Sequence, residues 1–211
     1  IERAELIPYI YDLTRHAKDY LKELGLAEAS VCPTGHWWHA YTVSAFTSSL
    51  DIVSQRKGNT FIPAHKILER NGTELGIPLG RSKVIPDQLF AIRYPEGFRA
   101  FLLEVDRGTE PIRSRAARKS LSKSVEQYSQ LLKTDAHRLH YGLKANTLVL
   151  WVFTSPATMG EFQSLLQAKC PAQAPSFLCK VVPFLLSWEN LQGVHQAVWV
   201  SGDGQKMVEL K

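Results

Sequence analysis

The sequence predicts an α/β fold in which helices flank a mixed central sheet. Two apolar segments, 83–94 and 98–106, are joined by a short Pro-Glu-Gly stretch, which is typical of an antiparallel hairpin. The segment TLVLWVF, 147–153, is a continuous apolar run, as expected for a strand covered on both faces. Helical patterns separate these strands along the chain. Parallel and antiparallel strands are therefore expected in one sheet.

The N-terminal part predicts a short aromatic strand, a helix, a linker and a second helix. In the first helix Ala17, Tyr20, Leu21 and Leu24 recur at helical spacing. Pro33 and Gly35 interrupt the segment 28–38, which is therefore expected to be a linker. The second helix follows, with an apolar face that steps by three, four and three residues, namely Val43, Phe46, Leu50 and Val53.

The elements around the hairpin follow from the same patterns. Residues 60–62, with Ile67 and Leu68 further on, predict one strand or two short strands before a turn at Asn71-Gly72. After the hairpin, the residues Ala117, Leu121, Val125, Tyr128 and Leu132 form the stripe of a helix expected over 116–132.

The C-terminal part predicts a helix, a strand and a hairpin. Thr158 and Glu161 have capping-box spacing at the start of a short helix that ends near Ala168. The segment FLCKVV, 177–182, is expected to be a strand, and the tail to form a hairpin with its turn at 202–204.

Composition indicates a globular cytoplasmic protein. The 211 residues suffice for one large domain, or for one domain with a small appendage, and 45% of them are apolar. No apolar run is long enough to span a membrane, and the first residues lack the pattern of a signal peptide. The three cysteines, Cys32, Cys170 and Cys179, are an odd number without a CxxC pair, so a reducing compartment is expected.

Three acids stand at the ends of the two hairpin strands. Alternation places Glu104 and Asp106 on one face of the second strand. If the turn has two residues, Tyr94 pairs with Gly97 and Asp87 lies opposite Glu104. If Gly97 instead forms a left-handed bulge, the register shifts by one residue and Asp87 pairs with Val105. In that second register Asp87 and Glu104 face opposite ways unless a second bulge intervenes.

In the first register, three carboxylates crowd one end of the sheet. Like charges at such short range repel each other, and a divalent cation would compensate them. Hard oxygen ligands suit Mg²⁺ or Mn²⁺. Asp87, Glu104 and Asp106 are therefore the candidate metal ligands.

Positive charge gathers directly after these acids. The net charge is +5, and one short segment carries six cations against a single acid, Glu110: Arg107, Arg113, Arg115, Arg118, Lys119 and Lys123. A solvated helix face explains such a segment, and so does a surface that binds the phosphates of DNA. Helix geometry places Lys119 and Lys123 away from the apolar stripe, towards solvent or a DNA backbone.

The acidic pattern resembles that of a known nuclease fold. A Pro-Asp pair in one strand, followed by an acid-x-residue triplet in the next, resembles the restriction-endonuclease-like fold with its PD-(D/E)XK motif. More narrowly, IPDQLFAIRYPEGFRAFLLEVDRGTEP, 85–111, is similar to the nuclease-like domain of the plasmid replication-relaxation family. The resemblance extends over roughly Tyr41 to Val182. It implies a metal-dependent phosphodiesterase in which Asp87 and Glu104 hold the metal.

The resemblance also predicts the domain organisation. Members of this family carry a winged helix in front of the nuclease-like domain, and YIYDLTRHAKDYL resembles its last wing strand and closing helix. Residues 1–30 are therefore expected to be the end of a winged-helix module or a helical lead-in. Residues 36–211 are expected to form the nuclease-like domain.

The chain departs from the nuclease pattern at Asp106, which stands where the pattern has lysine. That lysine is thought to orient the attacking water and stabilise the charge that builds on the phosphate. Arg107 and Arg118 are the candidates to replace it, with Arg107 the catalytic choice. Asp106 could instead be a third metal ligand.

Other residues admit both a functional and a packing interpretation. His36 and His39 have the HxxH spacing of zinc ligands, but they lie in a segment expected to be an aromatic loop. Ser124 and Tyr128 stand where some nucleases of this fold carry a Gln-x-x-x-Tyr pair. Because Tyr128 belongs to the apolar stripe, a role in core packing is expected for it.

Two functions follow from the sequence. The first is a metal-dependent DNA endonuclease or nickase that acts in plasmid replication or mobilisation. The alternative is a DNA-binding replication or regulatory factor whose nuclease-like domain has lost its chemistry and serves as a scaffold or as the dimerisation unit of a homodimer. The missing lysine favours the alternative, and the retention of three acids favours the enzyme, which is the preferred hypothesis.

Overall fold

The computed structural model describes residues 14–25, 37–106, 120–182, 199–208 and 210. The chain divides into two compact units, Ile1–Thr34 and Gly35–Lys211. In the first unit, helix α1 spans Arg15–Glu23, and the Thr14 hydroxyl caps it by accepting a hydrogen bond from the Ala17 amide at 3.2 Å. The helix predicted around Ala17 is thus confirmed. The expected strand before it lies outside the described residues, so the winged-helix assignment stays a prediction.

The second unit contains the predicted mixed sheet. Its described strands lie in the order β1-β4-β5-β6-β7-β8-β9. The contacts between β5, β6 and β7 are parallel, and the others are antiparallel. The bounds are β1 Thr60–Pro63, β4 Gln88–Tyr94, β5 Gly97–Asp106, β6 Asn146–Phe153, β7 Phe177–Val181, β8 Trp199–Ser201 and β9 Met207–Val208.

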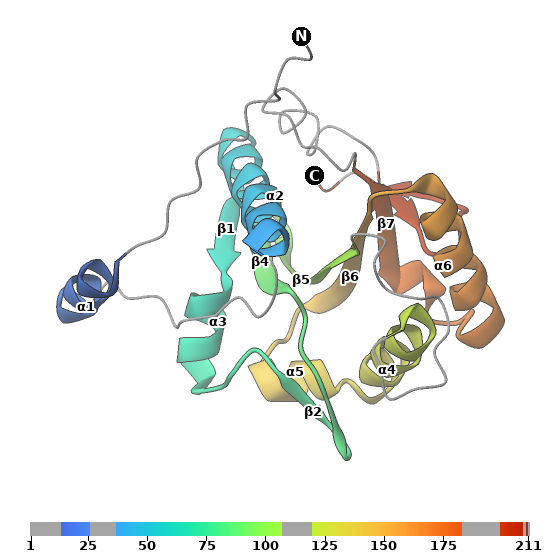
Figure 1. Ribbon diagram of the computed structural model, residues 1–211, viewed down its shortest axis with the longest axis horizontal. Coiled ribbons are helices and arrows are strands. Elements are labelled where there is room, and N and C mark those ends of the chain that lie inside the picture. The colour runs from blue at the N-terminus through green and yellow to red at the C-terminus, as the bar shows by residue number, and fades with distance from the viewer. Residues whose placement is uncertain (1–13, 26–36, 107–119, 183–198, 209, 211) are drawn as a thin grey trace, which may run out of the picture. The chain divides into compact units, whose positions relative to one another are not determined.

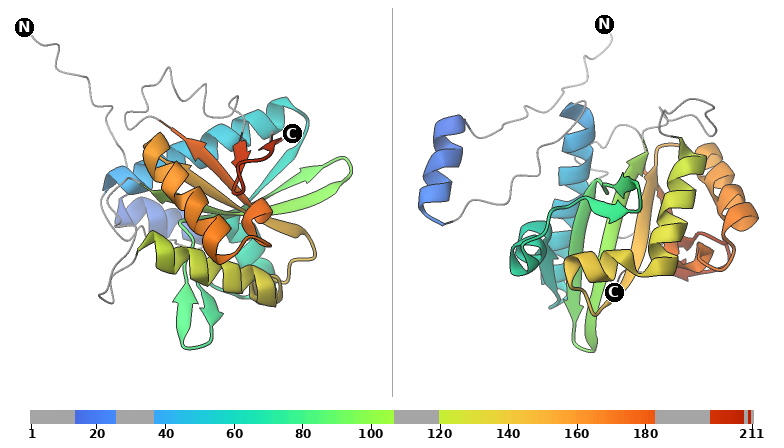
Figure 2. Two further views of the ribbon diagram at one scale, coloured as in Figure 1. Left: turned by 90° about the vertical axis from the view of Figure 1, so that its right-hand side faces the viewer. Right: turned by 90° about the horizontal axis from the view of Figure 1, so that it is seen from below.

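Helices cover both faces of this sheet (Figures 1 and 2). Helix α2, Trp37–Arg56, packs on one face, against the odd-numbered residues of β5 such as Phe101 and Leu103. The other face meets four helices: α3 Ala64–Asn71, α4 Leu121–Thr134, α5 Ala136–Tyr141 and α6 Pro156–Lys169. The core therefore has two layers, one on each side of the sheet, which explains why β6 is apolar throughout its length.

Two helices confirm the apolar stripes predicted for them. Val43, Phe46, Leu50 and Val53 of α2 are all buried. In α4, Leu121, Val125 and Tyr128 are buried against the sheet, and the Ser120 side chain caps the helix by accepting from the Lys123 amide. The helix begins at Leu121 and not near 116 as predicted, because Ser120 is extended, with φ −146° and ψ 153°, and forms the N-cap.

Three further element predictions were wrong. Segment 83–94 is not one strand, because residues 85–87 separate a short strand, Ser82–Val84, from β4, which begins at Gln88. Ile67 and Leu68 lie on helix α3 and not on a strand, because Ala64, Ile67 and Leu68 share one buried helical face and Gly72 ends the helix with φ +59°. The capping residue of α6 is Ser155, which accepts from the Ala157 amide, and not Thr158. Pro156 at the first helical position fits this earlier start.

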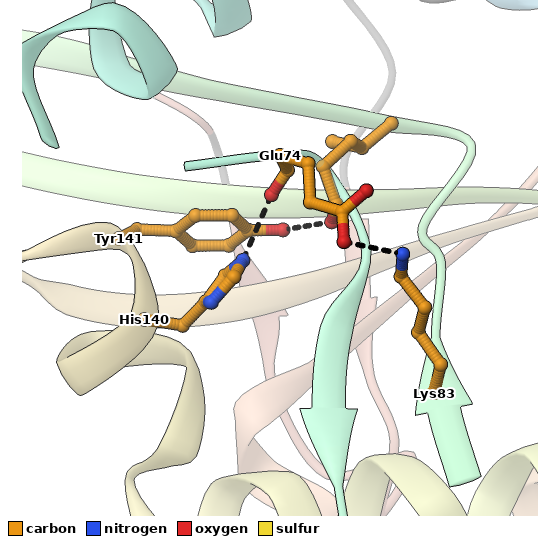
Figure 3. A network of polar contacts seen from close by, with 5 residues as sticks. Glu74, Lys83, His140 and Tyr141 are labelled. Atoms are coloured by element: carbon orange, nitrogen blue, oxygen red, sulfur yellow. Dashed lines mark hydrogen bonds and ion pairs between the residues drawn. The ribbon is translucent and has the colours of Figure 1, made fainter. Parts of the chain in front are cut away.

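A small hairpin leads the chain into the sheet. Strands β2, Ile77–Leu79, and β3, Ser82–Val84, form a separate antiparallel pair. Figure 3 shows how polar contacts tie this region to α5: His140 Nε2 lies 2.8 Å from the Glu74 carbonyl oxygen, and the Tyr141 hydroxyl donates to the Leu75 carbonyl at 2.5 Å. Lys83 reaches Glu74 at 2.6 Å and lowers the pKa of that carboxyl. These contacts attach the β2-β3 region, which precedes Asp87 in the chain, to helix α5.

Candidate active site

The β4-β5 hairpin adopts the first of the two predicted registers. Tyr94 pairs with Gly97 and Gln88 pairs with Leu103, as a two-residue turn requires, so the alternative bulged register is not formed. Asp87 precedes Gln88 and therefore stands beside Glu104. The Asp87 amide donates to the Leu103 carbonyl at 2.9 Å, which continues the pairing beyond the end of β4. The first of the two predicted registers is thus the correct one.

Two groups hold the Asp87 carboxylate. Its Oδ2 accepts a hydrogen bond from the Val105 amide at 2.7 Å, and its Oδ1 lies 3.0 Å from His39 Nε2. The first contact fixes the carboxylate to strand β5, and the second connects it to the beginning of helix α2. Asp87 is thus positioned by two elements that are distant from it in sequence, β5 and α2.

Glu104 is buried and accepts a short hydrogen bond from helix α4. It is 3% exposed, and the Tyr128 hydroxyl donates to its Oε1 at 2.5 Å. Burial, followed by the charges of Glu104 and Asp87, raises the pKa of Tyr128 well above its ordinary value. The phenol therefore stays protonated and acts as a donor.

Two further polar groups, one on β6 and one on α4, lie near Glu104. Trp151 of β6 pairs with Glu104 across the parallel register, and its ring meets that of Tyr128 edge-on at 5.5 Å. Ser124 lies one helical turn before Tyr128 on the buried side of α4. Within the described part of the chain, neither the Ser124 hydroxyl nor the Trp151 indole nitrogen has a hydrogen-bond partner. Buried polar groups without a hydrogen-bond partner are rare because they destabilise a fold, and here two of them lie near the buried Glu104.

Asp106 ends β5 and is 6% exposed. It lies two residues after Glu104, so alternation along the strand places both side chains on the face covered by α4. The third acid is thus an inward-facing group at the same end of the sheet. The structure does not assign it to either predicted role, replacement of the lysine or additional metal ligand.

Only one of the predicted cations of the basic segment is described. Lys123 is exposed on α4, as its position relative to the apolar stripe predicted. Arg107, Arg113, Arg115, Arg118 and Lys119 lie outside the described residues, as does Glu110. Their roles on phosphate or in catalysis therefore stay predictions.

The sequence analysis missed two basic residues near this end of the sheet. His39 was noted only for its spacing from His36, in a segment expected to be a loop, whereas the described chain is helical from Trp37. Lys180 of β7 is 4% exposed, its Nζ lies 5.5 Å from the Trp199 ring centre, and burial lowers its pKa to about 8. Leu178, two residues before it on β7, belongs to the core cluster on the α2 face, so alternation places Lys180 on that face, whereas Glu104 faces α4. One sequence feature could have identified Lys180, namely its position inside the strand predicted over 177–182.

The carboxylates among the described residues suit a hard cation whose coordination shell the protein fills only in part. Among the described residues, no group of three or more His, Cys, Asp or Glu side chains could enclose a metal ion. A structural zinc site needs four such ligands. Mg²⁺ is usually bound by one or two carboxylates, with water and substrate phosphate completing its shell. Asp87 and Glu104 match this second pattern in type and number.

The fold and this end of the sheet define the class of protein: an α/β domain with a mixed sheet and buried acids where β5 ends. The family follows from comparison, since the model of the replication-relaxation family matches residues 3–147. The chain belongs to this family, which points to a role in plasmid replication or mobilisation and to interaction with DNA. No curated protein and no solved structure matches the chain. None of the described helices is long and apolar enough to cross a lipid bilayer.

Proposed function

We propose that the protein is a metal-dependent DNA endonuclease or nickase that acts in the replication or mobilisation of a plasmid or other mobile element. The observation that supports this proposal is the register of the β4-β5 hairpin, in which the Asp87 amide and carboxylate bond to Leu103 and Val105, the residues on either side of Glu104. A protein that served only as a scaffold would have no need to place these two acids together and to bury one of them. Family membership supports DNA as the partner.

In this proposal Asp87 and Glu104 hold Mg²⁺ or Mn²⁺, and water and phosphate oxygens complete the shell. The cation would polarise a phosphate oxygen and lower the pKa of bound water. The Val105 amide and His39 orient the Asp87 carboxylate, and Tyr128 orients that of Glu104. Such partners of ligand residues typically affect metal affinity or activity by about 10- to 100-fold.

His39 is proposed as a positioning residue for Asp87. It stands at the start of a long helix, so its ring is held by a rigid element. Arg107 stays the proposed catalytic cation in place of the missing lysine. Arg113, Arg115, Arg118, Lys119 and Lys123 are proposed to contact the phosphates of DNA, a contribution that should weaken with added salt.

The alternative is a DNA-binding factor without nuclease activity. One observation favours it: Asp106 occupies the position of the lysine, and a carboxylate cannot stabilise negative charge on a phosphate. In this alternative Asp87 and Glu104 are structural residues, satisfied by His39, Val105 and Tyr128. The domain would then bring DNA and partner chains together, including a second copy of itself.

Plasmid cleavage separates the two functions. Supercoiled plasmid is incubated with the protein and Mg²⁺ or Mn²⁺, beside the Asp87→Asn and Glu104→Gln variants. Both substitutions keep an acceptor for the observed hydrogen bonds, so the fold is expected to persist. We expect the wild type to produce nicked or linear plasmid, a chelator to abolish the reaction, and each variant to lose at least about 100-fold in rate. Glu161→Gln, which changes an exposed acid on α6, serves as the matched control.

A second pair of variants tests the positioning role of His39. His39→Ala should slow cleavage by about 10- to 100-fold, and His39→Gln should restore part of the rate because an amide can donate to Asp87. If wild type and acid variants leave the plasmid equally intact while the protein still retards DNA in a gel, the nuclease proposal fails and the alternative stands.

A further inference from the structure

A polar cleft lies at the opposite end of the sheet from the three acids. Its volume is about 520 Å³, within the range of roughly 300–1,000 Å³ that is common for small-molecule sites. Its walls come from the beginning of β5, the beginning of β6, the turn between α4 and α5, and the segment before β7. Arg99 in this wall is five residues from Glu104 along β5, or roughly 16 Å at strand spacing. The cleft is therefore a separate site.

Two arginines give the cleft a positive charge. Arg99 reaches it from β5, and Arg138 reaches it from α5. Asp135 also lines the cleft, but its carboxylate lies 3.7 Å from Arg138 Nη1 and is largely exposed, so it holds the guanidinium only loosely. The other Arg138 nitrogen donates to the Lys144 carbonyl at 3.0 Å, which fixes the side chain over the loop. Two guanidinium groups against one carboxylate leave an excess of positive charge.

Uncharged groups complete the lining. Thr147 is 8% exposed, and within the described residues its hydroxyl has no hydrogen-bond partner. Gln173 accepts from the Ser129 hydroxyl through its carbonyl oxygen at 3.4 Å, which leaves its amide nitrogen to donate. Leu148 and Pro175 add apolar surface. The cleft thus combines charged donors, neutral donors and apolar walls, the mixture that small-molecule sites use.

We propose that this cleft binds a nucleotide through its phosphate group. Guanidinium groups bind phosphate with paired, charge-assisted hydrogen bonds, so Arg99 and Arg138 are the phosphate ligands. The apolar surface of Leu148 and Pro175 takes the sugar and base, with Gln173 as a polar partner. The nucleotide comes either from the free pool or from a strand of DNA, since both present the same phosphate chemistry. The proposal does not depend on cleavage at Asp87 and Glu104.

Calorimetric titration with deoxyadenosine monophosphate tests the site. We expect saturable binding with one site per chain, weaker binding of inorganic phosphate, and none of deoxyadenosine. Arg99→Gln should weaken the affinity about tenfold or more, because a hydrogen bond to a charged group is lost. Arg93→Gln is the matched control, since it removes an exposed arginine from the neighbouring strand outside the cleft. Its affinity should stay within about twofold of wild type, as an exposed residue without a ligand contact predicts.

Competition with short single strands distinguishes the sources. If an oligonucleotide with a 5′ phosphate displaces the mononucleotide and the unphosphorylated strand does not, the cleft binds a DNA end. If neither strand competes, the ligand is a free nucleotide. Absence of saturable binding by both mononucleotide and inorganic phosphate overturns the proposal, as does an equal loss in Arg99→Gln and Arg93→Gln. The Asp87→Asn variant should bind normally, so failure of cleavage and failure of this site are separate outcomes.

Discussion

At the scale of single residues, Tyr128 shows how the core and the candidate site share side chains. Its ring belongs to the apolar stripe of α4, as the sequence predicted, and its hydroxyl donates to Glu104. A purely hydrophobic stripe would not need the oxygen. The Tyr128 ring therefore packs in the core, and its hydroxyl orients the buried Glu104 carboxylate.

Replacement of Tyr128 by phenylalanine should reveal the second task. The substitution keeps the ring and leaves Glu104 Oε1 without this donor, so we expect a loss of about 1.5–3 kcal/mol in the free energy of unfolding. Tyr141→Phe is the control, because its hydroxyl donates at the same distance to an uncharged carbonyl, for which about 0.5–1.5 kcal/mol is typical. Urea denaturation measures both. An equal or smaller loss in Tyr128→Phe would show that Glu104 gains nothing from the phenol.

Lys180 makes the stability depend on pH. Burial lowers its pKa from 10.5 to about 8, so between these values the unfolded chain binds a proton that the folded chain does not. Linkage then requires the contribution of Lys180 to the free energy of unfolding to rise with pH across this window, by up to about 3 kcal/mol. Lys180→Met should remove this rise, whereas Lys123→Met, on an exposed position, should keep it. Denaturation series at pH 7.5 to 10.5 provide the measurement, and identical slopes for wild type and Lys180→Met would contradict the prediction.

Residue by residue, the sequence predicted what depends on local pattern and missed what depends on long-range packing. Alternation along one strand predicted that Glu104 and Asp106 share a face, and the two-residue turn predicted Asp87 opposite Glu104. His39 could not be connected to Asp87, because no local signal says that helix α2 begins beside β4. The same holds for Lys180, whose burial is set by Trp199 from a later strand.

At the scale of elements, length decided which predictions succeeded. Long segments with several periodic positions, such as β6 and α2, were predicted correctly. For the short helix α3 the sequence pattern predicts a strand, because two adjacent apolar residues, Ile67 and Leu68, do not distinguish a period of 2 from one of 3.6. The buried position of Ala64 supplies the third point of the helical face, and only the structure shows it.

The C-terminal hairpin, β8 and β9, packs against the rest of the domain, and substitution of Gly202 in its turn tests this packing. The Gly202 amide donates to the Phe177 carbonyl at 2.8 Å, and a Cβ at this position would lie 2.5 Å from the Ala174 carbonyl oxygen and 2.7 Å from Leu166 Cδ1. Backbone cannot yield as a flexible side chain does. Gly202→Ala should therefore destabilise the protein by about 1–3 kcal/mol, the usual cost of overpacking.

Gly160→Ala provides the matched comparison for this element. Gly160 lies inside α6, and no atom would come within 4 Å of an added Cβ. The higher helix propensity of alanine should stabilise the protein by about 0.5–1 kcal/mol. Opposite signs in chemical denaturation are therefore expected for the same substitution at the two glycines. Two changes of equal sign would show that the hairpin is not packed against α6 and the segment before β7.

At the scale of the whole molecule, the sheet separates two kinds of chemistry. The acids gather where β5 ends, and the arginine-lined cleft lies where β5, β6 and β7 begin. The parallel arrangement of these strands is the cause, because it places equivalent ends side by side. The proposed nuclease site and the proposed nucleotide site, at opposite ends of one sheet, could be occupied at the same time without steric conflict.

The second compact unit should fold without the first. Both described core clusters draw only on residues of Gly35–Lys211, from Val43 to Leu210. A fragment of residues 35–211 should therefore keep its cooperative unfolding transition, with a free energy of unfolding within about 1 kcal/mol of the whole chain. Circular dichroism during urea denaturation tests this. A fragment that loses cooperativity would show that the first unit contributes to the core.

Removal of the other end should have the opposite effect. Trp199 is 2% exposed and packs edge-on against Phe46 of α2 at 5.8 Å, so β8 supplies part of the core on that face. A fragment that ends at residue 198 loses this ring and the pairing of β8 with β7. We expect it to lose at least about 3–5 kcal/mol, the cost typical of deleting a buried tryptophan. Because the deletion at the start is longer, a greater loss at the end would show that packing, and not chain length, decides the stability of this domain.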